Sequence, residues 1–187
     1  MGGAAYLGRG GACPAAVGER LLAMALPVPP GATAGKQPTD RPKNRTGVLN
    51  LDQYVAANYD PQWAETATRA AKERGFVTAA CRAWKNPDGS QSQMMLVQYA
   101  SATGAQAHYR GLHGLWTEDT STTFFDDPDD QAAGLLHTKP IMDGMTYASL
   151  LTTRGNILVY VTHFTPKTPD RDTAQDLFHR QLSALAG

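Results

Sequence analysis

The side chains best suited to catalysis or metal binding are the histidines, and their spacing is not typical of a known site. The five are His108, His113, His137, His163 and His179. His108 and His113 are five residues apart, so they do not share a helix face as ligands three or four residues apart do. No histidine combines with cysteines or carboxylates at zinc-ligand spacing. We therefore predict no metal site and no cofactor.

An acidic segment within residues 117–134 is the next candidate. It contains Asp126-Asp127-Pro128-Asp129-Asp130 and, just before it, the apolar pair Phe124-Phe125. Carboxylate oxygens suit Ca²⁺, but the alternating spacing and the glycine of a helix-loop-helix calcium site are absent. The segment is therefore predicted to be a long solvated loop. Phe124 and Phe125 either anchor this loop to the core or form the lip of a binding site.

Motifs of covalent catalysis and phosphate binding are absent. The chain has no Gly-x-Ser-x-Gly elbow, no phosphate-binding loop and no dinucleotide fingerprint. We therefore predict no catalytic residues and a protein that is not an enzyme. The alternative is a hydrolase-like enzyme with a dispersed active site, for which His163, Asp143 and Arg82 are the candidate residues.

The elements that must position any site are clearest between Gly75 and Trp116. Two apolar runs, Phe76–Lys85 and Gln91–Ala100, flank Asn86-Pro87-Asp88-Gly89. This tetrapeptide suits a type I turn followed by a glycine bulge, so it predicts a β-hairpin. Ser101 or Thr103 then begins a helix that continues through Trp116.

The same turn predicts which residues face each other across the hairpin. It places Asn86 opposite Ser90 and then pairs Ala83 with Gln93, Cys81 with Met95, Ala79 with Val97, and Val77 with Tyr99. One face is then small and apolar, which suits a closely packed helix. The other face is larger and mixed, and we predict it to bind a ligand. The predicted ligand-binding residues are Phe76, Arg82, Trp84 and Met94, together with Phe124 and Phe125.

A second hairpin-helix unit follows near the C-terminus. Met145–Thr152 and Ile157–Phe164 flank Arg154-Gly155, which suits a two-residue turn, and Thr168 then caps a last helix. Helical segments between Asn50 and Gly75 precede both units. The order predicts an α+β fold, α-ββ-α-ββ-α, with an antiparallel four-stranded sheet from two β-hairpins and helices packed mainly on one face.

Composition separates a leader from a single folded domain. Residues 1–47 are rich in glycine and proline and include the polar linker Lys36–Arg45, so we predict an irregular leader there and one α+β domain at residues 48–187. The formal net charge of +0 argues against nucleic acid or an anionic membrane as main partner. No apolar run reaches transmembrane length, so membrane attachment requires a tether outside this chain.

The two cysteines, Cys13 and Cys81, allow one disulfide at most. Cys81 lies inside a predicted strand, where a thiol behaves as a small apolar side chain. The alternative is a Cys13–Cys81 bridge, which requires an oxidising compartment.

Short segments from residue 25 onward carry a resemblance to a known group of proteins. They are Leu26-Pro27-Val28-Pro29-Pro30-Gly31-Ala32, Leu51-Asp52-Gln53-Tyr54, Arg74-Gly75-Phe76 and Tyr109-Arg110-Gly111-Leu112. With them the chain resembles exported actinobacterial proteins of unassigned function and, more loosely, the α+β sensor or lipoprotein domains of the same bacteria. The resemblance implies an extracytoplasmic domain, secreted or membrane-tethered. Because the N-terminus is not typical of a signal peptide, a cytoplasmic location is the alternative.

These observations favour a non-enzymatic extracytoplasmic domain that binds or senses a small ligand or a protein partner. A hydrolase-like enzyme is the first alternative. A structural module of a cell-surface complex is the second.

Overall fold

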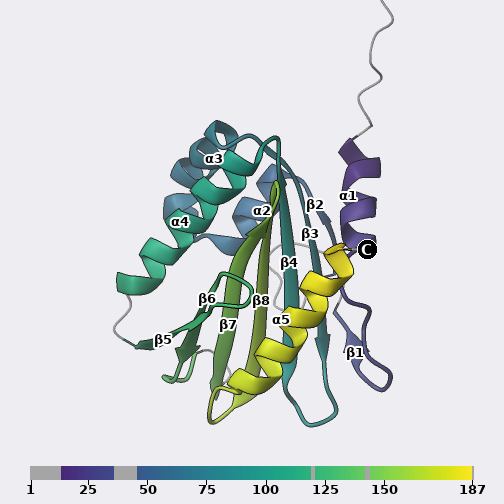
Figure 1. Ribbon diagram of the computed structural model, residues 1–187, viewed down its shortest axis with the longest axis vertical. Helices are drawn as coiled ribbons and strands as arrows, with labels where there is room; N and C mark the ends of the chain where they lie inside the picture. The colour runs from purple at the N-terminus through teal and green to yellow at the C-terminus, as the bar shows by residue number, and fades with distance from the viewer. Residues whose placement is uncertain (1–13, 36–45, 119–120, 142–143, 187) are drawn as a thin grey trace, which may run out of the picture.

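The structure, a computed structural model, describes residues 14–35, 46–118, 121–141 and 144–186. Within these ranges eight strands form one sheet (Figure 1). They are β1 (Thr33–Ala34), β2 (Gly47–Leu49), β3 (Phe76–Lys85), β4 (Gln91–Tyr99), β5 (Thr122–Asp127), β6 (Ala132–His137), β7 (Met145–Arg154) and β8 (Ile157–Pro166). The order is β1-β3-β4-β8-β7-β6-β5, β2 also pairs with β3, and all pairings are antiparallel.

Helices cover both faces of this sheet. They are α1 (Pro14–Ala23), α2 (Leu51–Asn58), α3 (Ala64–Glu73), α4 (Ala102–Glu118) and α5 (Arg171–Ala186), with a short 3₁₀ turn, η1 (Pro61–Trp63), before α3. In Figure 1 α5 crosses in front of the strands, and it shares a buried apolar core with the end of α1. The helices α2, α3 and α4 share a separate core on the opposite face. None of the described helices is both long and apolar enough to cross a membrane.

Along the central strands, successive side chains point alternately into the two cores, as the two-residue period of a β-strand requires. On the α1/α5 side, Trp84, Met94, Leu96 and Phe178 are almost completely buried. On the α2/α3/α4 side the strands contribute buried residues that range in size from Ala79 to Tyr99.

The predicted α+β class is confirmed, but the sheet has eight strands rather than four, and the helices are not mainly on one face. Residues 117–134, predicted to be a loop, contain β5 and the start of β6. The turn between them places Gln131 at a φ of 48°, a left-handed conformation that glycine usually supplies. No glycine therefore marks this hairpin in the sequence.

The first hairpin has the predicted register over most of its length. The Asn86 N–H donates to the carbonyl of Ser90 at 2.8 Å, Ala79 faces Val97, and Gly89 has a φ of 89°. The prediction is wrong at the far end. A bulge between Phe76 and Thr78 makes Phe76, not Val77, the residue opposite Tyr99. Phe76 therefore packs in the α2/α3/α4 core, on the face opposite Trp84.

The second hairpin and the last helix begin where the sequence predicts, within two residues. Arg154 pairs with Ile157, so the turn is Gly155-Asn156 rather than Arg154-Gly155. Asp170, not Thr168, caps α5, because its carboxylate accepts from the N–H of Thr173 at 3.0 Å. The two hairpins meet at the centre of the sheet through the pairing of β4 with β8.

The predicted irregular leader contains α1, which is a correction to that prediction. Leu21 and Ala25 are each only 2% exposed, because they pack on the sheet. The guanidinium of Arg82 on β3 donates to the carbonyls of Ala25 at 2.7 Å and Leu22 at 3.0 Å, at the C-terminal end of α1. The side-chain oxygen of Gln181 on α5 also accepts a hydrogen bond from the backbone N–H of Leu26. The division of the chain at residue 47 stays a prediction.

Candidate functional site

A pocket of about 510 Å³ lies between α3 and α4, and it is called the α3–α4 pocket below. Its size falls within the range of about 300–1,000 Å³ that small-molecule sites occupy. Most of its lining is apolar. The lining residues are Asn58, Tyr59, Asp60, Trp63, Thr66, Ala67, Ala70, Arg74, His108, Gly111, Leu112 and Leu115.

Two large apolar side chains at this pocket are open to solvent. Trp63 is 58% exposed and Leu115 is 59% exposed. They are the most exposed of the large apolar residues that the structure describes, and both line the same pocket. Exposed apolar surface that gathers at a concave site is typical of ligand binding, whereas single exposed residues are not.

Arg74 forms part of the wall of the pocket because two glycines of α4 leave room for it. Gly104 and Gly111 are two helical turns apart and face the same way. A Cβ on Gly104 would lie 2.0 Å from the carbonyl oxygen of Arg74, and one on Gly111 would lie 3.2 Å from its guanidinium. The chain reverses after Arg74 through Gly75, whose φ is 75°. The half-buried guanidinium therefore lies along α4.

His108 lines the α3–α4 pocket among three tyrosines. Its Nδ1 lies 2.5 Å from the hydroxyl of Tyr99, and its Nε2 lies 3.3 Å from the hydroxyl of Tyr54 and 3.5 Å from that of Tyr59. Burial and the positive charge of Arg74 lower the pKa of His108 to about 3. The imidazole is therefore neutral at ordinary pH, with one nitrogen donating and the other accepting.

The tyrosine hydroxyls are equally unsuited to carry charge. Burial, and then the nearby Tyr59 and Tyr99, raise the pKa of Tyr54 well above its ordinary value. Burial likewise raises the pKa values of Tyr59 and Tyr99. A neutral imidazole among protonated phenols offers hydrogen bonds, not proton transfer near neutral pH. The arrangement suits binding better than catalysis.

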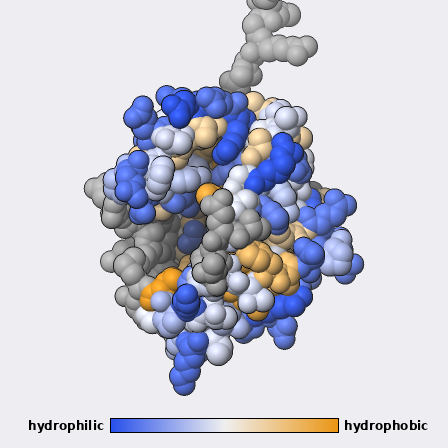
Figure 2. Space-filling model, turned by 90° about the vertical axis from the view of Figure 1, so that its left-hand side faces the viewer, coloured by the Kyte–Doolittle hydropathy of each residue, from blue (hydrophilic) through white to orange (hydrophobic). Residues whose placement is uncertain are grey.

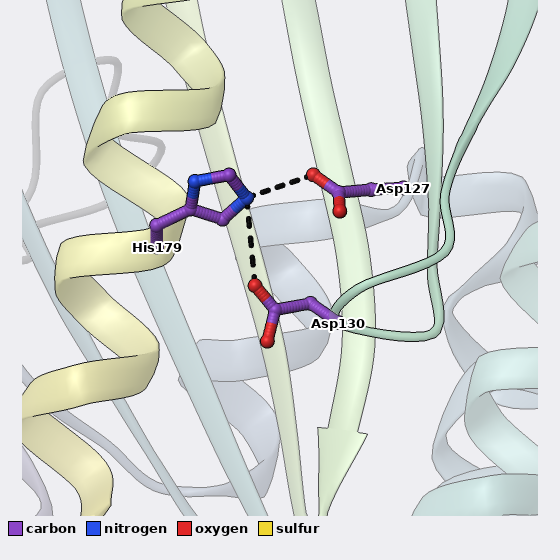
Figure 3. A group of neighbouring side chains, drawn as sticks. All are labelled: Asp127, Asp130 and His179. Carbon is purple, nitrogen blue, oxygen red and sulfur yellow. Dashed lines mark hydrogen bonds and ion pairs between the residues drawn. The ribbon is translucent and has the colours of Figure 1, made fainter.

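A second polar group lies on the other side of the sheet, between α5 and the turn from β5 to β6 (Figure 3). The Nε2 of His179 lies 2.8 Å from Asp127 and 3.4 Å from Asp130. Asp127 is only 4% exposed. Burial alone would raise the pKa of Asp127, but hydrogen bonds from Gln175 and His179 together lower it.

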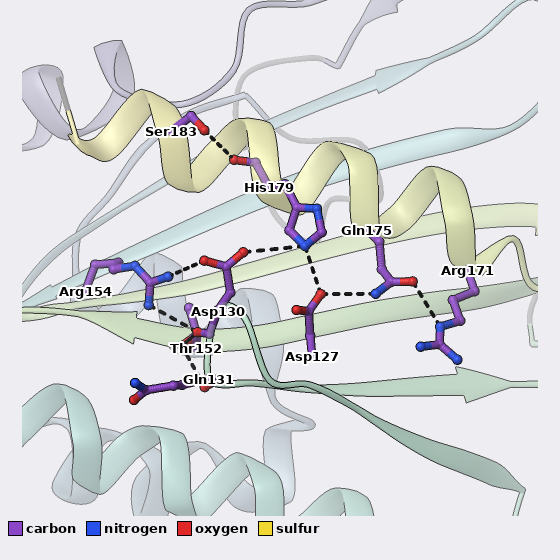
Figure 4. A network of polar contacts seen from close by, with 9 residues as sticks. All are labelled: Asp127, Asp130, Gln131, Thr152, Arg154, Arg171, Gln175, His179 and Ser183. Carbon is purple, nitrogen blue, oxygen red and sulfur yellow. Dashed lines mark hydrogen bonds and ion pairs between the residues drawn. The ribbon is translucent and has the colours of Figure 1, made fainter.

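Asp127, Asp130 and His179 are the residues that could hold a cation, since their ligand atoms lie within 4.8 Å of one another. Both carboxylates already have protein partners (Figure 4). Gln175 donates to Asp127 at 3.0 Å, and Arg154 forms an ion pair with Asp130 at 2.6 Å. This acid–histidine cluster therefore has a structural role without any ion: it joins the β5–β6 turn to α5 and β7.

The predicted ligand-binding residues do not form one site. Arg82 binds the end of α1, while Trp84 and Met94 are 1% and 0% exposed beneath α1 and α5. Phe76 lies on the opposite face. A ligand-binding role for these four stays a prediction, and the structure gives each of them a packing or helix-capping role.

The two phenylalanines of β5 point to different surroundings. Phe125 covers Gly134, where a Cβ would lie 2.2 Å from the ring, and the guanidinium of Arg171 lies 4.1 Å from the ring centre. Phe124 is 39% exposed. Figure 2, viewed from the left-hand side of Figure 1, shows a mainly hydrophilic surface with separate apolar patches. A role of Phe124 and Phe125 in ligand binding also stays a prediction.

The other chemical candidates are buried or lie outside the described residues. His163 is 3% exposed, and its Nδ1 lies 2.9 Å from the hydroxyl of Ser92, which is 1% exposed. Burial lowers the pKa of His163, against the opposing effect of Asp170. Asp143 and Cys13 lie outside the described residues, so neither the dispersed site nor the bridge is tested; Cys81 is buried.

Sequence reasoning missed the α3–α4 pocket because its residues come from four elements, α2, η1, α3 and α4. The one signal in the sequence is the face of α4 that carries His108, Gly111 and Leu115 at helical spacing. Trp63 and His108 gave no motif by themselves. Trp63 and His108 lie at the same pocket only because η1 and α3 pack beside α4.

Comparison with known proteins places this geometry on a known fold. The structure superposes on the crystal structure of the extracellular domain of PknH from Mycobacterium tuberculosis with a TM-score of 0.63 and 14% sequence identity. The match covers 90% of this chain and 96% of that domain. The two share a fold. No protein-family profile and no curated protein sequence matches the chain. The neighbour is an extracellular domain from an actinobacterium, which agrees with that much of the resemblance stated from the sequence.

Proposed function

We propose that this protein is an extracytoplasmic sensing domain that binds a small ligand with an apolar body in the α3–α4 pocket. The observation that carries the proposal is the gathering of exposed apolar side chains, Trp63 and Leu115, at one pocket of ligand size. The hydroxyl of Tyr59, beside the neutral His108, gives the same pocket a polar group that can orient a ligand without reacting with it.

The proposed extracytoplasmic location is supported by the fold. The structural neighbour is an extracellular domain, and the likeness extends over nearly the whole of both chains. A binding domain also agrees with the burial of the Ser92–His163 pair, since a nucleophile must reach its substrate. A protein partner is the alternative ligand, and the small size of the pocket favours a small molecule.

Native mass spectrometry of the protein purified from its host tests the proposal. We expect a small molecule to remain bound to the unaltered chain and to be lost from the Leu115→Ser variant. Phe124→Ser is the matched control, because it removes an exposed apolar side chain from β5, away from the pocket. Retention by Leu115→Ser together with loss from Phe124→Ser would move the site to β5.

A further inference from the structure

We infer that the ligand of the α3–α4 pocket is an anionic amphiphile, with an apolar chain between Trp63 and Leu115 and an anionic head group on Arg74. The inference rests on the proposed function and adds the chemical class of the ligand. It depends on the charge, burial and surroundings of a single guanidinium.

Arg74 is a half-buried cation that no described anion neutralises. Its guanidinium has no hydrogen bond and no ion pair to any residue within the described ranges. The two half-buried arginines that do lie on the sheet have partners: carbonyls accept from Arg82, and Asp130 forms an ion pair with Arg154. A cation shielded from water without a partner is costly, and an anionic group from a ligand removes that cost.

The surroundings of Arg74 select an anion rather than a neutral polar group. Arg74 lines the same pocket as Tyr59 and His108. Its positive charge partly opposes the rise that burial causes in the pKa values of Tyr54 and Tyr59, and it adds to the lowering of the pKa of His108 by burial. None of the three side chains is charged near neutral pH. An incoming carboxylate or phosphate therefore meets one cation, with the neutral hydroxyl of Tyr59 on the same pocket wall.

One acidic side chain also lines the pocket. Asp60 lies just before η1 and is exposed to solvent. Water screens its charge, whereas the charge of Arg74 acts in partly enclosed surroundings. If Asp60 decided the selectivity instead, the pocket would prefer a cationic amphiphile. A test must therefore include both signs of charge.

The apolar body of the ligand follows from the mouth of the pocket. Trp63 on η1 and Leu115 on α4 both line the pocket, and each is more than half exposed. Covering both side chains stabilises the complex, since the burial of apolar surface is favourable. The head group and the apolar body then contact different ends of one pocket.

Calorimetric titration at pH 7.5 with three ten-carbon probes tests the inference: decanoate, 1-decanol and decyltrimethylammonium. We expect decanoate to bind at least tenfold more tightly than either of the others. Arg74→Gln should remove that difference, and Arg74→Lys should keep part of it. The control Arg69→Gln removes an exposed arginine of α3 that does not line the pocket and should behave as the unaltered protein. A fourth probe, decyl phosphate, distinguishes a phosphate head group from a carboxylate.

The outcomes separate the two proposals. Equal binding of decanoate and 1-decanol overturns the anionic head group and leaves the apolar pocket standing. Tighter binding of decyltrimethylammonium than of decanoate also overturns the anionic head group, because it would mean that Asp60 rather than Arg74 decides the charge of the ligand. No binding of any probe overturns the inference together with the proposed function. The comparison of probes on the unaltered protein is independent of whether an Arg74 variant folds.

Discussion

The hydroxyl of Tyr99 lies 2.5 Å from Nδ1 of His108, which joins the last residue of β4 to the middle of α4. The contact is buried, and it makes the imidazole part of the fold as well as part of the pocket wall. The pH dependence of stability should therefore reveal its protonation.

The first prediction concerns His108. The pKa of histidine in an unfolded chain is about 6.5, and in the folded protein that of His108 is about 3. Between these values the unfolded state binds one more proton, so the free energy of unfolding falls by about 1.4 kcal/mol per pH unit as pH decreases. In His108→Gln this part of the slope should be absent between pH 6 and pH 4.

Urea unfolding at several pH values measures both slopes. His163, whose pKa burial also lowers, contributes to the unaltered protein and to the variant alike, so it cancels in the comparison. Identical slopes for the two proteins would show that His108 titrates normally in the folded state.

The second prediction concerns the acid–histidine cluster. Asp127→Asn keeps the size of the side chain but removes the charge that His179 and Gln175 face. We expect a loss of about 1–3 kcal/mol in the free energy of unfolding, as for a buried hydrogen-bonded charge. Since the pKa of Asp127 is lowered by folding, its stabilisation is present above about pH 4 and is lost as pH falls below that value.

Thermal unfolding at pH 7 and at pH 3 measures this effect. The control is Asp129→Asn, which changes an exposed carboxylate in the same turn. The gap between Asp127→Asn and the unaltered protein should narrow at pH 3. A gap that stays constant would assign the loss to shape rather than to charge.

The third prediction concerns the glycines of α4. A Cβ at Gly104 would lie 2.0 Å from the backbone oxygen of Arg74, directly after α3, so Gly104→Ala must push α4 away from the end of α3. We expect a loss of about 1–3 kcal/mol, as for overpacking elsewhere. At Gly114 a Cβ would meet no atom within 4 Å, so Gly114→Ala should gain about 1 kcal/mol from helix propensity.

Chemical denaturation of the two alanine variants decides this point. Equal effects at both positions would mean that α3 and α4 do not approach as closely as the structure shows. A binding measurement with decanoate adds a second readout, because separation of the helices at Gly104 also displaces Arg74.

The fourth prediction concerns Arg82 and the end of α1. Arg82→Met keeps much of the apolar stem but removes the bonds to the carbonyls of Leu22, Ala25 and Leu26. Hydrogen bonds to a charged group each contribute about 1.5–3 kcal/mol, so α1 should open locally. Hydrogen exchange should increase in residues 17–26 and remain unchanged in α3. Unchanged protection of residues 17–26 would show that Leu21 and Gln181 suffice to hold α1.

The predictable parts of the fold are those with local signals. Pro87, Asp88 and Gly89 specify the turn of the first hairpin, and its register followed correctly from Asn86 to Ala79. The turn between β5 and β6 also contains proline and aspartate, but its left-handed residue is Gln131. Without glycine at that position, the sequence is not distinguishable from an acidic loop.

The candidate site was harder to predict because tertiary contacts create it. The bulge after Phe76 has no signature in composition, yet it reverses the face of that side chain. Metal-ligand spacing gives no signal for His108, because its partners are three tyrosines: Tyr54 on α2, Tyr59 at the end of α2 and Tyr99 on β4. Contacts between residues distant in sequence determine the surroundings that make a polar residue functional.

The pairing of β4 with β8 has a consequence for how the chain reaches this fold. Each hairpin can form from neighbouring residues, but Ser92 and His163, which face each other across this pairing, are 71 residues apart. Closing so long a loop loses chain entropy before the contacts compensate for it, which makes such steps slow. The strands β4 and β8 contribute to both cores, so neither core is complete until they meet. We therefore expect the folding rate of the whole domain to depend on the encounter between the two hairpins.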